Sequence, residues 1–486
     1  MKEDIKKYDL ILDGKRLQSI SGKEATIQNP ADGKEIASVP ECGPGDLNRA
    51  VVAADRAFRS GPWRRLSSRE RSRLLYRLST LLRDNAVELS RLESQNVGKP
   101  IRESRDEVQL AADCFQFYAG AIDKTGGQNA PVAAPGVGLT FREPIGVCGL
   151  IIPWNFPIAI SCWKIAPALA MGNTVVVKPA SQTPLTALRV AELALDAGIP
   201  PGVLNVVTGP GNLLGEALVR HPLVRKISFT GSTEVGRSVM KAASDDIKRV
   251  TLELGGKSAN IVFEDADMNK AVPSAVWSAL GNAGQDCCAR SRLLLQRSVR
   301  EEFLAKLVDQ FKKVRVGDPL DEKTELGSLI SKTHRERIRT YVEVGVAEGA
   351  RLLCGGDIPT EAALSNGSFL KPAIFSDVTP SMRIAQEEIF GPVVSVLTFE
   401  TEEEAIALAN NSVYGLSGSL WTRDIGRALR VAKSVETGVL SVNSGHSVHL
   451  EMPFGGVKLS GVGRELGLAV LDHYSEWKSV FISTQE

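Results

Sequence analysis

The sequence predicts an α/β protein built around a parallel, doubly wound sheet. From residue 147 onward, short runs rich in valine, isoleucine and leucine alternate with segments whose apolar residues recur at helical spacing. Strands that alternate with helices require right-handed crossovers, which place the strands parallel and the helices on both faces of the sheet. The length of 486 residues exceeds what one hydrophobic core serves, so we expect two or three domains.

The chain before about Gly120 is expected to be helical. Residues 50–58 (AVVAADRAF) and 74–82 (LLYRLSTLL) both carry apolar side chains at helical spacing. The basic run from Arg64 to Arg83 alternates arginines with leucines, which indicates the solvated face of one helix. A nucleic-acid-binding surface is therefore not expected here.

The next segment supplies three strands and a helix. Runs rich in β-formers occupy 147–153 (VCGLIIP), 173–179 (NTVVVKP) and 203–209 (VLNVVTG). Between the second and third runs, residues 185–198 (LTALRVAELALDAG) have helical spacing, and Gly198 and two prolines end that helix.

A second α/β region follows Gly255. Residues 303–312 (FLAKLVDQFK) form its clearest helix, and further β-rich runs continue to about Asn443. Residues 130–144 (APVAAPGVGLTFREP) are rich in proline and glycine and alternate in polarity, so they form either a linker or a projecting hairpin.

Composition excludes several classes of protein. Lysine and arginine total 58 against 57 aspartate and glutamate, and the net charge of +1 provides no general attraction for nucleic acid or an anionic membrane. The start of the chain is too charged for a signal peptide, and no apolar run approaches the ~20 residues needed to span a bilayer. Seven cysteines without a CxxC pair indicate reduced thiols, a cytoplasmic location and no metal site.

The strongest chemical signal is the motif AGQDCCARSR at 283–292, in which Cys287 is the candidate nucleophile. The motif LELGGK at 252–257 places Glu253 in an apolar run that ends in a Gly-Gly turn. A thiol and an available carboxylate favour covalent catalysis followed by base-assisted hydrolysis. Each residue alone also fits a structural role, as a small buried side chain or an ordinary strand end.

A phosphate site is one interpretation of GSTEVGRS at 231–238. It follows the strand-like KISFT and precedes a helix, so backbone N–H groups are free to face an anion. A P-loop NTPase is not favoured, because Arg237 stands where that motif needs lysine. The GxGxxG fingerprint is absent here and in GPGNLLG at 209–215, and an ordinary strand-to-helix turn stays possible.

Three further segments fit a scaffold poorly. PWNFP at 153–157 sets an aromatic residue and an amide between two prolines, in a position suited to a rigid site wall. Lys178 lies at a strand end within reach of a ribose or phosphate. In EEIFGP, Glu388 and Phe390 precede a Gly-Pro turn.

Together these segments resemble the aldehyde dehydrogenase superfamily. The resemblance runs in family order through PWNFP, KPAS, FTGSTEVG, LELGGK, GQDC, EEIFGP and PFGGVKLSGVGRE, and it spans nearly the whole chain. It implies an NAD(P)-dependent, non-acylating enzyme that forms a homodimer or homotetramer. The implied parts are a variant Rossmann cofactor domain at 1–125 and 145–254, an α/β catalytic domain at 255–455, and a small β oligomerisation arm at 126–144 and 470–486.

The resemblance also implies residue roles. The Cys287 thiolate attacks the aldehyde, the Asn155 amide and the Cys287 N–H hold the oxyanion, and Glu253 activates the water that hydrolyses the thioester. Cys288 is a neighbour of the nucleophile. The catalytic set also includes Lys178, and the remaining positions that match family contacts are Trp154, Lys178, Ser181, Gly231, Ser232, Glu388 and Phe390 for the cofactor and Asp286, Trp163, Ile160, Val448 and Phe454 for the aldehyde.

The chain departs from the family pattern at two positions. Ser181 stands where many NAD-preferring relatives have glutamate, which removes a charge that would repel a 2′-phosphate, so the cofactor is NAD or NADP. Asp286 precedes the nucleophile as in some aminoaldehyde dehydrogenases, and a carboxylate at the tunnel favours a cationic tail unless it only binds local backbone. The alternative function is a CoA-acylating semialdehyde dehydrogenase, against which Glu253 argues.

Overall fold

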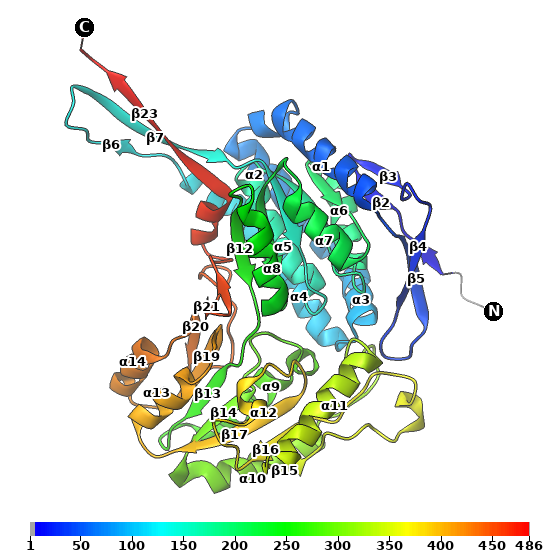
Figure 1. Ribbon diagram of the computed structural model, residues 1–486, viewed down its shortest axis with the longest axis vertical. Coiled ribbons are helices and arrows are strands. Elements are labelled where there is room, and N and C mark those ends of the chain that lie inside the picture. The colour runs from blue at the N-terminus through cyan, green and yellow to red at the C-terminus, as the bar shows by residue number, and fades with distance from the viewer. Residues whose placement is uncertain (1–4, 486) are drawn as a thin grey trace.

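The computed structural model describes residues 5–485 and contains two large open sheets and a projecting β ribbon (Figure 1). The charged start at 1–4 and residue 486, the last of the expected arm, lie outside the described residues. Within 5–485, no helix is long and apolar enough to cross a membrane.

The first sheet has eight strands in the order β22-β12-β11-β8-β9-β10-β2-β3. Its central strands are parallel, namely β8 (Val147–Ile151), β9 (Thr174–Lys178), β10 (Leu204–Val206), β11 (Val224–Thr230) and β12 (Arg249–Glu253). The outer strands are antiparallel to their neighbours, namely β22 (Gly461–Val462) at one edge, and β2 (Leu10–Leu12) followed by β3 (Lys15–Leu17) at the other. The expected parallel sheet is thus confirmed at its centre and is mixed at its edges.

Helices cover both faces of this sheet, as a doubly wound fold requires. The first sheet and its helices share two hydrophobic clusters: Val175 and Val177 of β9 pack into one, and Val176 between them packs into the other, because successive strand residues point to opposite faces. The helices of the first part are α1 (Pro44–Arg59), α2 (Ser68–Asp84), α3 (Ala86–Val97), α4 (Ile101–Ala121), α5 (Pro157–Ala170), α6 (Leu185–Asp196), α7 (Gly211–Arg220) and α8 (Thr233–Ser244). Residues from α1, α7 and α8 lie in the second cluster, and those from α2 to α6 lie in the first.

Helix α2 confirms the interpretation of the basic run. Leu75, Leu78 and Leu82 are buried on one side, whereas Arg69 and Arg73 are exposed on the other. Arg69 and Arg73 therefore lie on a solvated helix face, whereas Arg71 donates to the Ala170 carbonyl at 3.2 Å, and Arg64 and Arg65 stand in a 3-10 helix before α2.

The expectation that the chain before Gly120 is helical is wrong for residues 6–40. This segment supplies β2 and β3 of the first sheet and a separate sheet of β1 (Lys6–Lys7), β4 (Glu24–Gln28) and β5 (Glu35–Pro40). These strands have two to six residues, which is too short for a two-residue alternation to stand out in the sequence.

The second sheet has seven strands in the order β15-β16-β17-β14-β13-β19-β20. All of its pairings are parallel except that of the edge strand β15 (Arg351–Cys354) with β16 (Ala373–Ser376). The other strands are β13 (Ala259–Val262), β14 (Arg292–Gln296), β17 (Val393–Phe399), β19 (Ser417–Trp421) and β20 (Val439–Val442). The helices of this part are α9 (Met268–Leu280), α10 (Arg300–Lys313), α11 (Lys332–Ala347), α12 (Arg383–Gln386), α13 (Glu402–Asn410) and α14 (Ile425–Ser434), and a two-stranded ribbon joins β18 (Tyr414–Gly415) to β21 (Val457–Lys458).

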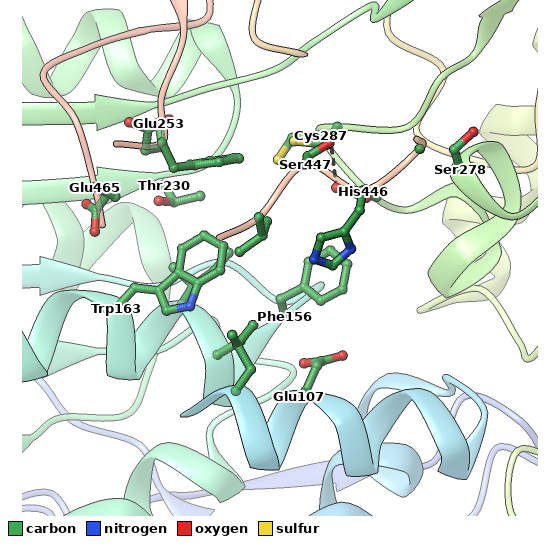
Figure 2. A pocket seen from close by; sticks show the side chains of 18 of the residues that line it. Glu107, Phe156, Trp163, Thr230, Glu253, Ser278, Cys287, His446, Ser447 and Glu465 are labelled. Atoms are coloured by element: carbon green, nitrogen blue, oxygen red, sulfur yellow. Dashed lines mark hydrogen bonds between the residues drawn. The ribbon is translucent and has the colours of Figure 1, made fainter. Parts of the chain in front are cut away.

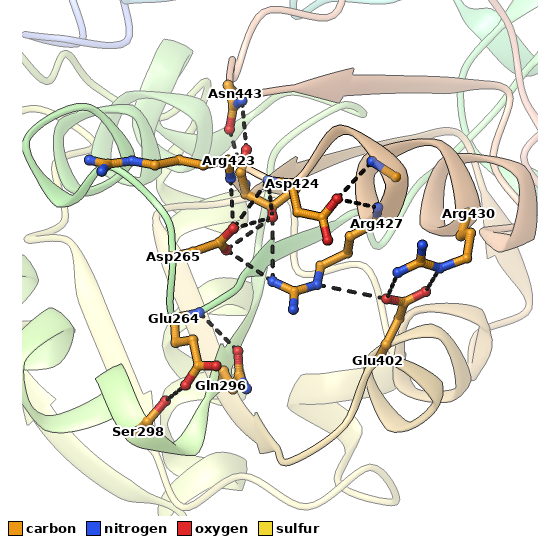
Figure 3. Close-up of polar contacts among 12 residues, drawn as sticks. Glu264, Asp265, Gln296, Ser298, Glu402, Arg423, Asp424, Arg427, Arg430 and Asn443 are labelled. Carbon is orange, nitrogen blue, oxygen red and sulfur yellow. Dashed lines mark hydrogen bonds and ion pairs between the residues drawn. The ribbon is translucent and has the colours of Figure 1, made fainter.

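Asp265 joins the ends of β13 and β19 to the start of α14 (Figure 3). Its carboxylate accepts hydrogen bonds from Thr422 Oγ1 at 2.8 Å, from the backbone N–H of Arg423 at 2.9 Å, and from Arg427 Nη1 at 3.1 Å. Asp424 then caps α14 by accepting from the N–H of Arg427 at 3.1 Å. One carboxylate thereby fixes the connection between neighbouring strands.

The proline- and glycine-rich segment is a projecting hairpin. Strands β6 (Asn129–Ala130) and β7 (Gly136–Pro144) are antiparallel, and β23 (Ser475–Ser483) completes a three-stranded ribbon that extends away from both sheets (Figure 1). The preceding 3-10 helix η6 (Ala469–Tyr474) packs Val470 and Leu471 into the core, so the ribbon strand begins at Ser475. The other 3-10 segments are η1 (Trp63–Arg65), η2 (Ile122–Lys124), η3 (Gly281–Gly284), η4 (Arg297–Val299) and η5 (Ala362–Leu364).

Candidate active site

A cavity of about 270 Å³ is lined by both halves of the fold. Figure 2 shows Cys287 and Ser447 on one side of it, facing Trp163, Phe156 and Glu107 on the other. Its lining comes from α4, α5 and α9, from the end of β12, and from loops at 286–290, 445–448, 454 and 465.

A left-handed turn precedes the loop that carries Cys287, which we call the nucleophile loop after its predicted role. Asn282, Ala283 and Gly284 have φ angles of 50°, 55° and 69°, a conformation that non-glycine residues seldom adopt. Glu103 of α4 stabilises it by accepting the Asn282 N–H at 2.8 Å. Cys287, the candidate nucleophile, follows this turn and is half-buried at the cavity wall.

Asn155 is fixed beside this loop. Its Nδ2 donates to the Gln285 carbonyl at 3.0 Å, and its own carbonyl accepts from Lys99 Nζ and Asn282 Nδ2, both at 2.8 Å. A side-chain amide carries two N–H groups, so the second one is available to a negatively charged oxygen.

The Glu253 carboxyl group is buried without a hydrogen-bond partner among the described residues. Glu253 ends β12 and is 4% exposed. Burial, and then the negative charge of Glu465, hold the pKa of Glu253 well above its usual range. A side chain at Gly455, whose φ is +153°, would stand 2.6 Å from Glu253 Oε1, so only glycine leaves this carboxylate room.

The surroundings of Cys287 favour the thiol over the thiolate. Contact with the Cys288 thiol, then burial and the negative charges of Asp286 and Glu388, raise the pKa of Cys287 well above its usual value. Glu253 lines the same cavity as Cys287.

The four predicted tunnel residues Ile160, Trp163, Val448 and Phe454 all line the cavity, and the rings of Trp163 and Phe454 meet edge to face at 5.4 Å. Asp286 also lines it, while its carboxylate accepts the Cys288 N–H at 2.8 Å. Asp286 therefore does bind local backbone, and its preference for a cationic tail stays a prediction. A carboxylate oxygen of Asp286 and the Sγ atoms of Cys287 and Cys288 lie within 4.8 Å of one another.

Sequence reasoning missed several lining residues, namely Glu107, Leu110, Phe156, Lys164, Trp277, Arg290, His446 and Glu465. Phe156 stands inside the PWNFP motif and could have been found there. Trp277 and Leu110 carry no local signal, because they look like ordinary apolar positions of α9 and α4.

The predicted cofactor residues form a second group outside the lining of this cavity. Lys178 ends β9 and is buried, and burial lowers its pKa to about 8. Ser232 caps α8 by accepting the Val235 N–H at 3.3 Å, and the Ser181 hydroxyl donates to the Gly209 carbonyl at 2.8 Å. A groove of about 670 Å³ lies between α7 and α8, lined by Ile151, Gly211, Gly215, Val219, Phe229, Val235 and Val239 among others.

Glu388 approaches this region from the second half of the fold. It accepts the Gly256 N–H at 3.0 Å, and burial raises its pKa to about 7. A Cβ atom at Gly255 would stand 2.3 Å from Glu388 Oε2, so a larger residue there would displace the Glu388 carboxylate. Phe390, at a φ of 60°, packs edge to face against Trp154 with ring centroids 5.3 Å apart. Gly231 connects the two groups, because its N–H donates to the Glu253 carbonyl at 3.1 Å.

The chain is similar to known proteins over nearly its whole length. Betaine aldehyde dehydrogenase of Bacillus subtilis (strain 168) is 45% identical over 477 residues, which are 98% of this chain and 97% of that protein. Retinal dehydrogenase 2 of Homo sapiens is 45% identical over 483 residues, 99% of this chain and 92% of that protein.

The fold is also similar to solved structures. Betaine aldehyde dehydrogenase of Staphylococcus aureus in complex with NAD+ has a TM-score of 0.97 at 40% identity, covering 98% of this chain and 95% of that one. The NAD+ complex of an aldehyde dehydrogenase from Bacillus cereus also has a TM-score of 0.97, at 42% identity, covering 99% and 97%. The sequence model described as Aldehyde dehydrogenase family matches residues 17–480. Its sequence and its fold therefore place this chain in the aldehyde dehydrogenase family.

Proposed function

We propose that this protein oxidises an aldehyde to a carboxylic acid with NAD as the hydride acceptor, Cys287 as the nucleophile and Glu253 as the base. The observation that carries the proposal is that a half-buried thiol and a buried carboxylate without partners line one cavity. Asn155, fixed beside the nucleophile loop, supports the same chemistry.

The residues of the cofactor group fit a dinucleotide. The groove between α7 and α8 is largely apolar, which suits a nucleobase, and a side chain at Gly211 would stand 3.5 Å from Lys178 Nζ at its edge. The N-terminus of α8 at Ser232 favours a pyrophosphate, and Lys178 and Glu388 offer a cation and an acceptor to ribose hydroxyls. When bound, NAD accepts the hydride that leaves the aldehyde carbon.

The protein groups then act in sequence. The Cys287 thiol gives its proton to water, and the sulfur forms a bond to the carbonyl carbon, whose oxygen becomes negative. The second N–H of Asn155 and the backbone N–H of Cys287 stabilise that oxygen. Loss of hydride leaves a thioester on Cys287.

Hydrolysis completes the cycle. Glu253 takes a proton from water, the water oxygen attacks the thioester carbon, and the C–S bond breaks to release the acid and the Cys287 sulfur. The position of Glu253 supports water over CoA as the acceptor. Addition of CoA should therefore leave the rate unchanged and yield no acyl-CoA, and formation of a CoA thioester would contradict the hydrolytic step.

Exchange of Cys287 tests the proposal directly. Cys287→Ala should abolish aldehyde-dependent NADH formation at 340 nm while the Kd for NAD stays within about twofold of the parent, because the thiol lies outside the cofactor group. Cys288→Ala is the matched control and should retain turnover. Turnover in Cys287→Ala, or loss only in Cys288→Ala, would show that the nucleophile is misassigned.

The cavity predicts the substrate class. Acidic residues outnumber basic ones among the lining groups, which are Glu107, Glu253, Asp286 and Glu465 against Lys164 and Arg290. Most of the remaining wall is apolar, so we propose a small apolar or cationic aldehyde and exclusion of a second carboxylate. Values of kcat/KM should be higher for hexanal and 4-aminobutanal than for succinic semialdehyde, and the reverse order would refute this proposal.

We also propose that the ribbon of β6, β7 and β23 pairs with a second copy, giving a homodimer or homotetramer. Val137, Phe141, Trp477, Phe481 and Ile482 are all exposed on its strands, and such a patch costs free energy in water. Light scattering should give a multiple of the 52.3 kDa chain mass, and Phe481→Glu should lower it. Val87→Glu, at an exposed position on α3, is the control.

A cytoplasmic setting completes the proposal. All seven cysteines are free thiols. Covalent catalysis needs Cys287 reduced, and a reducing compartment keeps it so. Cell fractionation followed by immunodetection tests this location, and recovery of the protein in an oxidising compartment would refute it.

A further inference from the structure

We propose that Arg290 is a positioning residue that ties the nucleophile loop to the loop at 445–448 and offsets the negative charge of Asp286 beside Cys287. The inference rests on the proposed function, since it takes Cys287 as the nucleophile. Arg290 stands three positions after Cys287 in the chain, and it lines the same cavity.

The contacts of Arg290 join separate segments. The guanidinium is 2% exposed, and its Nη1 donates to the Cys288 carbonyl at 2.5 Å. Nη2 donates to Ser447 Oγ at 2.5 Å and to the Gly418 carbonyl at 3.0 Å, and Nε donates to Ser419 Oγ at 2.8 Å. The planar guanidinium thus holds the backbone after Cys287, the strand β19 and the cavity loop in one arrangement.

Arg290 also supplies charge where the thiol needs it. Asp286 raises the pKa of Cys287 and so disfavours the thiolate, and the charges of Asp286, Cys288 and Cys287 all interact with the Arg290 guanidinium. A permanently charged arginine favours the thiolate by the same Coulomb interaction with the opposite sign. The other ionisable groups that face Cys287 or line its cavity are Glu107, Lys164, Glu253, Glu388, His446 and Glu465.

Arg292 shows that burial alone does not give this role. It is 3% exposed and donates to the carbonyls of Lys257 at 2.8 Å and Ala409 at 2.8 Å. It is not among the residues that line the cavity. Two buried arginines two positions apart therefore provide a matched pair, of which one faces the nucleophile and one does not.

The test measures thiol ionisation without turnover. The rate of alkylation by iodoacetamide is followed against pH in the protein without cofactor, and mass spectrometry of peptides assigns the label to Cys287 or Cys288. Arg290→Gln should move the midpoint of the Cys287 profile upward by about one pH unit, which lowers the rate at neutral pH about tenfold. Asp286→Asn should move it downward, and Arg290→Lys should stay close to the parent.

Two controls separate charge from structure. Ser447→Ala removes a partner of Arg290 but no charge, and Arg292→Lys changes a buried arginine away from the cavity. Neither should move the midpoint, while Ser447→Ala should raise the KM for the aldehyde more than it lowers kcat.

Each outcome decides the inference. If Arg290→Gln does not fold, the double variant with Asp286→Asn removes both charges together, and its midpoint should lie about one unit above that of Asp286→Asn alone. Label on Cys287 with an unmoved midpoint overturns the role of Arg290 and leaves the proposed function standing. Label on Cys288 alone overturns both.

Discussion

Replacement of Glu253 by glutamine separates the two halves of the proposed reaction. Glutamine has nearly the same shape, and both oxygens of Glu253 are buried without partners, so no protein hydrogen bond among the described residues is lost. The amide does not accept a proton from water. A positioned general base contributes about two to four powers of ten in rate, which corresponds to about 3–5 kcal/mol of activation free energy.

The fold should tolerate this change. The folded-state pKa of Glu253 is raised first by burial and then by Glu465, so its favourable contribution to stability is complete below the unfolded pKa and is lost as the pH rises through the folded pKa. Between these two pKa values the contribution falls progressively as the pH rises. The melting temperature of Glu253→Gln should therefore equal or exceed that of the parent, and the difference should shrink in acid.

Stopped-flow measurement at 340 nm checks the kinetic part. If the thioester still forms in Glu253→Gln, NADH appears in a burst of one equivalent per active site and then slowly at the deacylation rate. Mass spectrometry of the quenched enzyme should find the acyl group on Cys287. Hydrolysis at the parent rate, or a slow steady state together with a lowered melting temperature, would refute the assignment of Glu253 as the base for water.

Three other predictions follow from single side chains. Burial lowers the pKa of Lys178 to about 8, so the Kd for NAD should rise from about pH 7 to about pH 9, and Lys178→Met should remove this dependence in a fluorescence titration. Ser181→Glu should lower the ratio of kcat/KM for NADP over NAD about tenfold, and an unchanged ratio would exclude Ser181 as the determinant. Asp265→Ala should cost about 1–3 kcal/mol of unfolding free energy in urea, whereas Glu264→Ala should cost less than about 0.5 kcal/mol. Burial raises the pKa of Asp265, but the hydrogen bonds that its carboxylate accepts lower it further, so the folded-state pKa lies below the usual value. The stability that Asp265 contributes should therefore be lost as the pH falls through this folded-state pKa.

Most of the central strands of the first sheet could be predicted from the sequence. Val147–Ile151 and Thr174–Lys178 are continuous apolar runs, which is how strands buried on both faces look, and the structure places them at the centre. The strands at 6–40 were missed because each is short. The pairing of such short strands depends on contacts between distant segments, such as Ile11 opposite Val206, which no local pattern reveals.

The candidate site divides in the same way. Cys287, Glu253 and Phe454 stand in recognisable motifs, and the structure brings all three to one cavity. Arg290 stands in one of those motifs as well, yet the role that we propose for it involves Ser447, which is 157 positions away. A buried ion pair between Lys164 and Glu465 at 2.6 Å was likewise invisible, since neither residue type is expected to be buried.

The pairing of β7 with β23 has a consequence for synthesis of the protein. Residues 136–144 are made long before their partners at 475–483, and the first sheet gains its edge strand β22 only when residues 461–462 emerge. A nascent chain thus carries an exposed apolar strand until residues 475–483 have been made. Chains stalled before residue 461 should be inactive and should aggregate, and supplying residues 461–485 as a separate peptide should recover part of the folded enzyme.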